Sequence, residues 1–328
     1  KVLEGGAHDF PLARGKVLSI SAGDGLRDFA GNLMDSNEYS FGLPVDAVPG
    51  GILFNELLFN PFPGEPDYIE FYNSSGKVVD ASSLILVSVN DETADTSSAC
   101  SIAVVPRSVL PGYCYAITTD RKSVIERYYS ALPLRLFEVN QLPSIPDDRG
   151  HLILFSRKLE KIDEVVYEEK MHYSLLGGTE GISLEKVREE GSSTDRSLWH
   201  SASEASGWGT PGAPNSVLVE AAKGGDAVSL SSERITPDND GFDDILIIDL
   251  KLEGPGNIVS VTVFDETGRF VKKIADNMLA GQGAMVVWNG TGADEKPVET
   301  GIYIFLITVF DDKGKTRRWK KVCTLIRE

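Results

Sequence analysis

The densest group of side chains that could do chemistry is the acidic run Asp238-Asn239-Asp240-Gly241-Phe242-Asp243-Asp244. Four carboxylates within seven residues repel one another, and no basic residue lies between Ile235 and Leu250 to relieve them. Oxygen ligands that alternate along a loop, with a glycine for the sharp turn, are what Ca²⁺ requires. The sequence therefore predicts a calcium site, with ligands from the side chains of Asp238 and Asp240, the carbonyl of Phe242, and a carboxylate of Asp243 or Asp244.

The same run has a simpler interpretation. Asp and Asn side chains accept hydrogen bonds from backbone N–H groups two residues further along, so an Asx-rich turn with solvated carboxylates needs no metal. The spacing is shorter than that of an EF-hand, and no glutamate stands at the twelfth position. Both the calcium site and the Asx-rich turn stay open at this point.

Catalytic chemistry has weaker support. Glu56 and Glu70 would be paired carboxylates if their strands are neighbours, but strand carboxylates more often face solvent, and Glu70 is expected to stay wet. His151, just after Asp147-Asp148, is interpreted as a half-buried histidine at the start of a strand. No metal-ligand spacing and no nucleophile elbow accompanies the four histidines, His8, His151, His172 and His200. We expect no enzyme within these residues, and no catalytic or cofactor-binding residues.

Two binding surfaces are conceivable. Five aromatic residues could form a carbohydrate platform: Tyr68, Phe71, Tyr72, Tyr128 and Tyr129. Core packing is the commoner role of such side chains. The basic run at 315–321 is the concentrated positive patch, and strand alternation places Arg317, Trp319 and Lys321 on one face. A solvated edge strand is favoured there over docking to a secretion machine or an acidic partner.

The composition excludes several classes of protein. A chain of 328 residues, 41% of them hydrophobic, can build two or three domains with real cores. The net charge of −17 repels phosphate backbones, so a nucleic-acid partner is not expected. The sequence contains no run of 18 apolar residues, so no transmembrane segment is predicted. The chain begins in mid-pattern at Lys1, so we interpret it as a fragment, and the missing signal peptide says nothing.

Short β-branched and aromatic runs bounded by Gly, Pro and Asn predict strands through residues 46–219. A helical crossing is predicted at 123–130, and a surface loop at 192–206 pinned by Trp199. Cys100 and Cys114 flank a predicted hairpin of strands 101–105 and 113–118, where a cross-strand disulfide is open but two separate core thiols are favoured. The other predicted strands are 52–59, 67–73, 83–89, 150–155, 162–167 and 182–187, a spacing that implies an antiparallel sandwich.

The regions on either side are also β-like. Residues 1–45 hold predicted strands at 16–21 and 38–41 around a turn-rich loop at 24–32, too little for a closed sandwich. Either more chain precedes Lys1, or these strands pack onto the next domain, with a linker at 44–51. Residues 220–226 contain Gly224-Gly225 and predict a flexible linker to a second all-β unit at 227–328. We therefore expect two sandwiches that move relative to each other.

Three motifs in order over residues 52–215 resemble a lamin tail domain. They are Ile52-Leu53-Phe54-Asn55-Glu56 followed by Tyr68-Ile69-Glu70-Phe71-Tyr72-Asn73, then Ser183-Leu184-Glu185-Lys186, and last Gly209-Thr210-Pro211-Gly212-Ala213-Pro214-Asn215. The resemblance implies a β-sandwich at 46–219. The nucleic-acid role of some nuclear lamin-type proteins is not carried over, because the charge opposes it.

The last unit resembles a different family. Pro237–Asp244, Trp288-Asn289-Gly290 and Gly301-Ile302-Tyr303 are similar to the Ig-like modules at the C-termini of bacterial secreted and gliding-motility proteins, and in pattern to the Ig-like domain of the flagellar hook-cap protein. The sequence departs from that family at Asp238, Asn239, Asp243 and Asn289. Residues 1–45 resemble the final strands of a bacterial Ig-like domain. The resemblance implies attachment or sorting at the cell surface.

Together these patterns predict an all-β chain of two Ig-like or lamin-tail β-sandwiches in tandem behind an N-terminal Ig-like remnant. We expect a secreted or cell-surface bacterial protein with a non-catalytic role in adhesion, ligand display or spacing. Its partner would be an unknown protein or glycan, and the C-terminal module would aid attachment or sorting. The alternative is an accessory region of a larger secreted hydrolase whose catalytic domain lies outside these residues. Function rests here mainly on analogy of fold.

Overall fold

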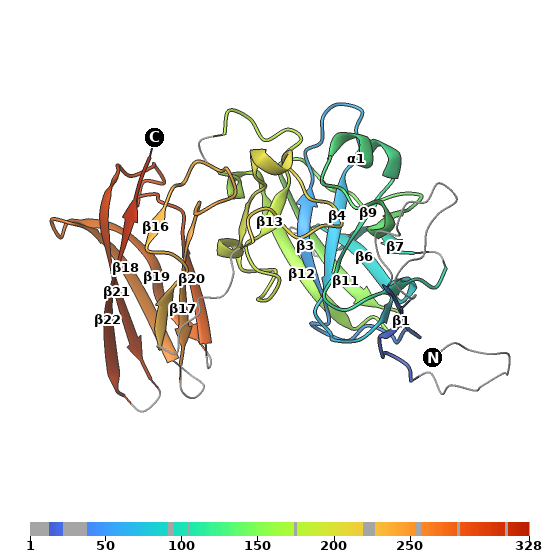
Figure 1. The fold of residues 1–328 in the computed structure, drawn as a ribbon, viewed down its shortest axis with the longest axis horizontal. Coiled ribbons are helices and arrows are strands. Elements are labelled where there is room, and N and C mark those ends of the chain that lie inside the picture. The colour runs from blue at the N-terminus through green and yellow to red at the C-terminus, as the bar shows by residue number, and fades with distance from the viewer. Residues whose placement is uncertain are drawn as a thin grey trace.

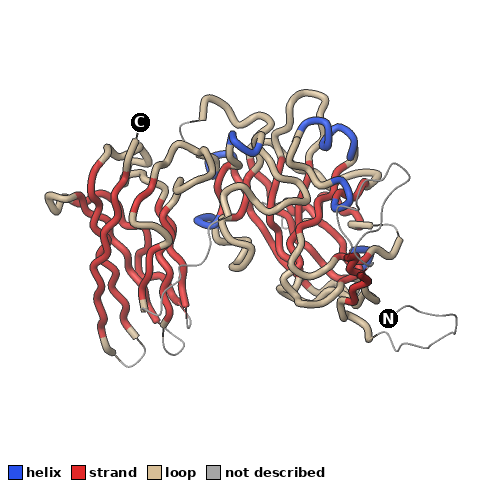
Figure 2. Tube along the Cα trace, in the orientation of Figure 1, coloured by secondary structure: helices blue, strands red, loops and turns tan. Residues whose placement is uncertain are grey.

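The chain folds into two β-sandwiches that lie side by side (Figure 1). The computed structural model describes residues 13–21, 38–90, 95–103, 105–173, 176–218, 227–252, 257–280, 283–311 and 314–327. Strands dominate both units (Figure 2). In this part of the chain the one α-helix is α1 (Arg121–Arg127), and no helix is long and apolar enough to span a membrane. The predicted all-β class is confirmed.

The first sandwich packs a six-stranded sheet, in the order β10-β9-β4-β3-β13-β14, against a four-stranded sheet, in the order β12-β11-β6-β7. A short ribbon, β5-β8, lies beside them. The strands are β3 (Ile52–Leu58), β4 (Tyr68–Asn73), β5 (Val79–Asp80), β6 (Leu84–Val89), β7 (Thr96–Ser101), β8 (Ser108–Val109), β9 (Cys114–Thr118), β10 (Leu136–Glu138), β11 (Arg149–Ser156), β12 (Lys161–Glu168), β13 (Leu184–Lys186) and β14 (Trp199–Ser201). Short 3₁₀ turns occupy Ala81–Ser83, Pro133–Arg135, Glu169–Met171, Arg196–Leu198 and Glu204–Ser206.

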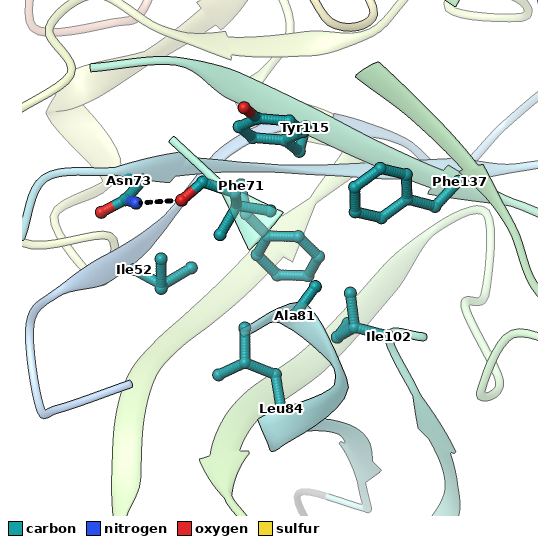
Figure 3. A pocket seen from close by; sticks show the side chains of 9 residues that line it. Ile52, Phe71, Asn73, Ala81, Leu84, Ile102, Tyr115 and Phe137 are labelled. Atoms are coloured by element: carbon teal, nitrogen blue, oxygen red, sulfur yellow. Dashed lines mark hydrogen bonds between the residues drawn. The ribbon is translucent and has the colours of Figure 1, made fainter. Parts of the chain in front are cut away.

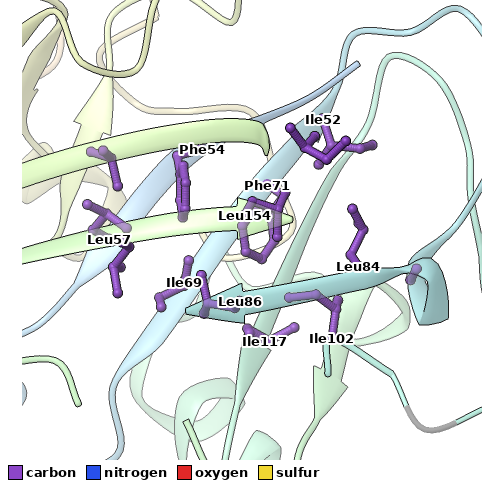
Figure 4. Packing of buried hydrophobic residues seen from close by; sticks show 14 of the residues in the cluster. Ile52, Phe54, Leu57, Ile69, Phe71, Leu84, Leu86, Ile102, Ile117 and Leu154 are labelled. Atoms are coloured by element: carbon purple, nitrogen blue, oxygen red, sulfur yellow. The ribbon is translucent and has the colours of Figure 1, made fainter. Parts of the chain in front are cut away.

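Alternating apolar side chains build the core of this sandwich (Figure 4). Leu152 and Leu154 of β11 are fully buried, and they pack in one cluster with Phe54 of β3 from the facing sheet. Burial of each such side chain contributes roughly 1.5–3 kcal/mol. The core leaves a void of ≈ 10 Å³ beside Phe71, about the volume of one water probe, where Asn73 Nδ2 donates to the Val109 carbonyl at 2.9 Å (Figure 3). The void is therefore a packing defect and not a ligand pocket.

The second sandwich has a three-stranded sheet, in the order β15-β17-β20, and a five-stranded sheet, in the order β16-β22-β21-β18-β19. Val259, Val261 and Val263 point into its core from β18, where Trp288 contacts the rings of Tyr303 and Phe305. The strands are β15 (Val228–Leu230), β16 (Arg234–Ile235), β17 (Leu246–Lys251), β18 (Asn257–Asp265), β19 (Phe270–Ala280), β20 (Gly283–Trp288), β21 (Gly301–Phe310) and β22 (Thr316–Leu325).

The N-terminal strands attach to the first sandwich. β1 (Leu18–Ser21) pairs with β2 (Glu38–Phe41), which confirms the two predicted strands, whereas the predicted loop at 24–32 lies outside the described residues. The Val45 N–H donates to the Val78 carbonyl at 3.0 Å, and the Val78 N–H donates to the Gly15 carbonyl at 3.0 Å. Ala47 is buried in the core of the first sandwich. The N-terminal strands therefore pack onto the next domain, which was one of the two alternatives. Residues 44–51 take part in this packing and are not a free linker.

The predicted hairpin of strands 101–105 and 113–118 is wrong. β7 ends at Ser101 and pairs with β6, whereas β9 pairs with β4 in the opposite sheet. Cys100 and Cys114 therefore belong to different sheets, and both are free thiols, as the favoured alternative predicted. Proximity in sequence suggested a hairpin, but the chain crosses between the sheets. β9 is largely buried, whereas β7 is an edge strand without a buried residue.

The predicted surface loop at 192–206 is also wrong in part. It contains β14, whose residues Trp199, His200 and Ser201 are all buried, and β14 pairs with β13 at the edge of the six-stranded sheet. The indole Nε1 of Trp199 donates to the Ser193 carbonyl at 3.0 Å. The polar composition hid this strand because its polar side chains find partners inside the protein.

The two sandwiches share a buried contact, which the expectation of independent motion did not include. Val187, Leu198 and Val217 of the first form one apolar cluster with Ile245 and Ile247 of the second, covered by Met285 and Val287. Beside it, the guanidinium of Arg188 binds the carboxylate of Asp249 through two hydrogen bonds of 2.8 and 2.6 Å. A bidentate pair next to an apolar cluster fixes relative orientation. The predicted linker at 220–226 lies outside the described residues.

We expect this contact to couple unfolding of the two sandwiches. Wild-type protein should melt in one calorimetric transition, and Ile247→Asp should split it in two, because a buried unpaired carboxylate costs about 3–5 kcal/mol at the contact. Ile302→Asp, at a half-exposed position of the same sandwich, is the control and should keep one transition. Two transitions in the wild type would show that the cluster does not couple the units.

Candidate functional site: a buried carboxylate network and an aspartate loop

Three buried glutamates at the centre of the six-stranded sheet form the most unusual polar group of the first sandwich. Glu56 lies on β3 with no exposed surface. Its carboxylate accepts hydrogen bonds from the Tyr68 hydroxyl at 2.6 Å, the Ser183 hydroxyl at 2.5 Å and the Thr210 N–H at 2.8 Å. Burial raises the pKa of Glu56, although these donors oppose the rise.

Glu185 of β13 shares one hydroxyl with Glu56. The Thr210 Oγ1 lies 2.7 Å from Glu185 Oε1 and 3.3 Å from Glu56 Oε2. A hydroxyl has a single hydrogen, so it can donate to only one of the two carboxyl groups. The second contact is a hydrogen bond only if that carboxyl group itself holds a proton. Consistently, burial and then the charge of Glu56 raise the pKa of Glu185 to about 8.

Glu70 of β4 extends the network on the other side. Its carboxylate accepts hydrogen bonds from Asn55 Nδ2 at 2.7 Å and from the Gly212 N–H. Burial and the charge of Glu56 raise the pKa of Glu70 well above its ordinary value. Asn215 Nδ2 donates to the carbonyls of Asn55 at 3.1 Å and Lys186 at 2.8 Å. The segment 210–217 is thus hydrogen-bonded to β3, β4 and β13.

The predicted pairing of Glu56 and Glu70 is confirmed, since they are register partners across β3 and β4. The expectation that Glu70 stays wet is wrong, because both carboxyl groups are fully buried. Side-chain hydrogen bonds to the closing segment decide this, and the two-residue period of one strand does not reveal them. Glu185 and its neighbour Lys186, also fully buried, were not proposed from the sequence, although both stand in the motif that carried the lamin-tail resemblance.

The other predicted features have structural roles. Tyr68, Phe71 and Tyr128 are buried, so among the predicted platform residues only Tyr129 is highly exposed. His151 Nε2 lies 2.8 Å from Glu164 Oε1. Neither arrangement presents aligned groups to a substrate.

A cleft of ≈ 870 Å³ lies between the two sandwiches. Its lysines and arginine are paired within the chain: Lys170 and Arg196 with Glu168 at 2.5 and 2.6 Å, Lys272 with Glu295 at 2.7 Å, and Lys273 with Asp276 at 3.0 Å. Pairing neutralises the charges that would attract a small anion.

Protonation of the network should make the first sandwich sensitive to pH. The folded pKa of Glu185, about 8, lies above its ordinary value of 4.5, so its contribution is complete below pH 4.5 and is lost as the pH rises through 8. Between pH 6 and pH 9 the free energy of unfolding should fall by roughly 2–3 kcal/mol, and Glu185→Gln should flatten this fall. Chemical denaturation at several pH values measures it, with exposed Glu126→Gln as the control. An equal fall in both variants would contradict the assignment.

The aspartate loop at 238–244 precedes β17. Asp244 is buried, and its Oδ1 accepts hydrogen bonds from the N–H groups of Asp238 and Asn239, while its Oδ2 accepts from the Gly241 N–H at 2.8 Å. Gly241 has a φ of +94°, and a Cβ there would lie 2.9 Å from the Ser203 hydroxyl. Asp238 Oδ1 accepts from the Asp240 N–H at 3.1 Å, and Asp240 Oδ1 accepts from the Phe242 N–H at 2.8 Å, which are the contacts of the Asx-rich turn that the sequence left open.

Three of the five predicted calcium ligands lie together. Oxygens of Asp238, Asp240 and Asp244 are all within 4.8 Å of one another. The Phe242 carbonyl already accepts a hydrogen bond from the Thr236 hydroxyl at 3.3 Å, and the Asp243 carboxylate lies 4.0 Å from Arg234. The residues fit a calcium shell only in part, and metal binding stays a prediction.

Calcium, if bound to the folded form, should raise the melting temperature. Occupancy at one hundred times the dissociation constant stabilises by about 2.7 kcal/mol. We expect a higher melting temperature in millimolar Ca²⁺ than in EGTA, and no such rise in Asp240→Ala. Asp294→Ala, in an exposed loop of the same sandwich, should keep the rise. Superimposable wild-type curves in the two buffers would leave the Asx-rich turn as the whole explanation.

Comparison with known proteins finds a family match within the second sandwich. Residues 229–323 match the family described as the CHU_C type IX secretion signal domain. The match confirms the predicted resemblance of this module to C-terminal modules of bacterial secreted proteins. A chain that carries such a domain is a secreted or cell-surface bacterial protein, as predicted. No curated protein matches the chain.

Three solved structures are similar at low TM-score. CopC from Methylosinus trichosporium OB3b has 16% identity over 30% of this chain and 91% of its own, with a TM-score of 0.22. FlgD from P. aeruginosa has 25% identity over 25% of this chain and 61% of its own, with a TM-score of 0.22. Latent PorU from Porphyromonas gingivalis has 10% identity, and the match covers 91% of this chain and 36% of PorU, with a TM-score of 0.25. Likeness at this level carries no argument about function.

Proposed function

We propose that the chain is a non-catalytic surface module, in which the first sandwich is displayed and the second directs export and attachment. The match of residues 229–323 to a type IX secretion signal domain carries this proposal. The shared apolar cluster and the Arg188–Asp249 pair support it, because they hold the displayed sandwich at a set orientation to the signal module.

The carboxylate network supports a non-catalytic role. A glycosidase needs its two carboxyl groups on either side of a substrate in an open cleft. Glu56 and Glu70 are instead fully buried and bound to structural donors. We keep the lamin-tail resemblance of the first sandwich as part of the proposal, with adhesion, ligand display or spacing toward a protein or glycan as its work.

Export tests the proposal with the whole chain. The 328 residues are fused behind an exported fluorescent reporter and expressed in a bacterium with a type IX system, and in the same strain lacking its outer-membrane translocon. We expect surface or released fluorescence only in the first strain, because the signal module directs passage. The reporter with its export leader alone is the control and should stay in the periplasm.

Equal retention of the chain in both strains would overturn the export role. Turnover of ester, phosphate or glycoside substrates by the purified chain, abolished by Glu56→Gln, would overturn the non-catalytic role.

A further inference from the structure

The second sandwich has two outer faces, and only one is covered. The outer face of its three-stranded sheet carries Ile245 and Ile247, which pack against the first sandwich with Val287. The five-stranded sheet lies on the side away from the first sandwich (Figure 1). Among the described residues, no outward side chain of this sheet belongs to a buried apolar cluster.

This uncovered face is strongly apolar. Register places Phe270, Phe264, Ile304 and Val322 in one row across β19, β18, β21 and β22. Ile302 and Leu306 flank that row on β21. We name these six residues the outer strip. Among the described residues after 227, seven large hydrophobic side chains are exposed by more than a third, and six of them lie on this face: Phe270, Leu279, Ile302, Leu306, Phe310 and Val322. An exposed apolar patch of this kind marks an interaction site.

Two cations stand beside the outer strip. Lys320 is the register partner of Leu306, and Arg318 is the register partner of Thr308. Both are exposed, and neither forms an ion pair with a described acidic side chain. These two unpaired cations give the face a local positive charge, although the net charge of the chain is −17. The predicted face of Arg317, Trp319 and Lys321 points the other way along β22 and is half-buried.

We infer that the outer face of the five-stranded sheet is the docking surface for a partner protein of the export apparatus, which presents an apolar strip bordered by carboxylates. The inference rests on the proposed export function and assigns it to a surface. Apolar contact along the outer strip supplies affinity, and Arg318 and Lys320 supply orientation and exclude basic partners.

A protein fits this face better than a membrane does. Phe270, Ile302, Leu306 and Val322 of the outer strip are 38–57% exposed, and its two other residues are half-buried, so the strip lies along a flat sheet and does not project as an inserting wedge would. Two cations attract an anionic bilayer by about 2 kcal/mol, against the repulsion of a chain with net charge −17. A second copy of the chain would bring Arg318 and Lys320 near the same two cations, which disfavours self-association.

The exported fusion of the whole chain tests the inference. One variant carries Phe270→Thr and Leu306→Thr, which keep β propensity, and another carries Arg318→Glu and Lys320→Glu. We expect each to lower surface and released reporter by about tenfold or more, the effect of losing a hot spot. Matched controls are Leu134→Thr, an exposed position of the first sandwich, and Lys296→Glu, an exposed position of the second sandwich off this face. Melting temperatures of the purified variants verify that all remain folded.

Each outcome decides the inference. Loss in both test variants with normal export of both controls supports it. If the wild type and the test variants are all exported normally, the inference is overturned and the proposed function stands. If the wild type itself is not exported, both the inference and the proposed function are overturned. Self-association of the purified wild type that is lost in Phe270→Thr/Leu306→Thr would assign the face to a second copy. Sedimentation with phosphatidylglycerol vesicles that is lost in the same variant would assign it to a membrane.

Discussion

The first sandwich depends on keeping three carboxyl groups satisfied without water. A buried carboxylate is costly unless donors surround it or it holds a proton. Thr210 and Gly212 supply such donors to Glu56 and Glu70 across 154 and 142 residues of sequence. These donors reach the sheet only when the segment 210–217 crosses it. Satisfying the carboxyl groups and closing the sandwich are therefore the same event.

The closed edge then serves as a base for the second sandwich. Val217 ends the segment that donates to Glu185, and it packs in the cluster that joins the two units. The polar network thus positions an apolar contact at its border. The second sandwich makes this contact with the outer face of its three-stranded sheet, and the outer face of its five-stranded sheet stays uncovered. This open face lies on the side away from the first sandwich (Figure 1).

Local patterns predicted much of the fold because each strand buries alternate residues. β18 is the clearest case, with Val259, Val261 and Val263 inside and threonine or serine between them. Predictions failed where the partner of a strand mattered more than its period. β7 and β9 enter different sheets, and β14 is a buried strand made of one aromatic and two polar residues. Such choices depend on the shared core and not on any one segment.

The candidate sites divide in the same way. Composition and motif spacing by themselves predicted an all-β chain, the possible pairing of Glu56 with Glu70, and a carboxylate-rich loop before β17, because these follow from charge and from residues near one another in the chain. The cell-surface location came from the resemblance of the last module to those of bacterial secreted proteins. Only the tertiary structure decided that Glu70 is buried and that the carboxylate oxygens of Asp244 accept hydrogen bonds from backbone N–H groups. It also decided that the first sandwich covers one outer face of the second sandwich and not the other. The physical reason is that burial and hydrogen-bond satisfaction are properties of contacts between distant segments, and no local period encodes them.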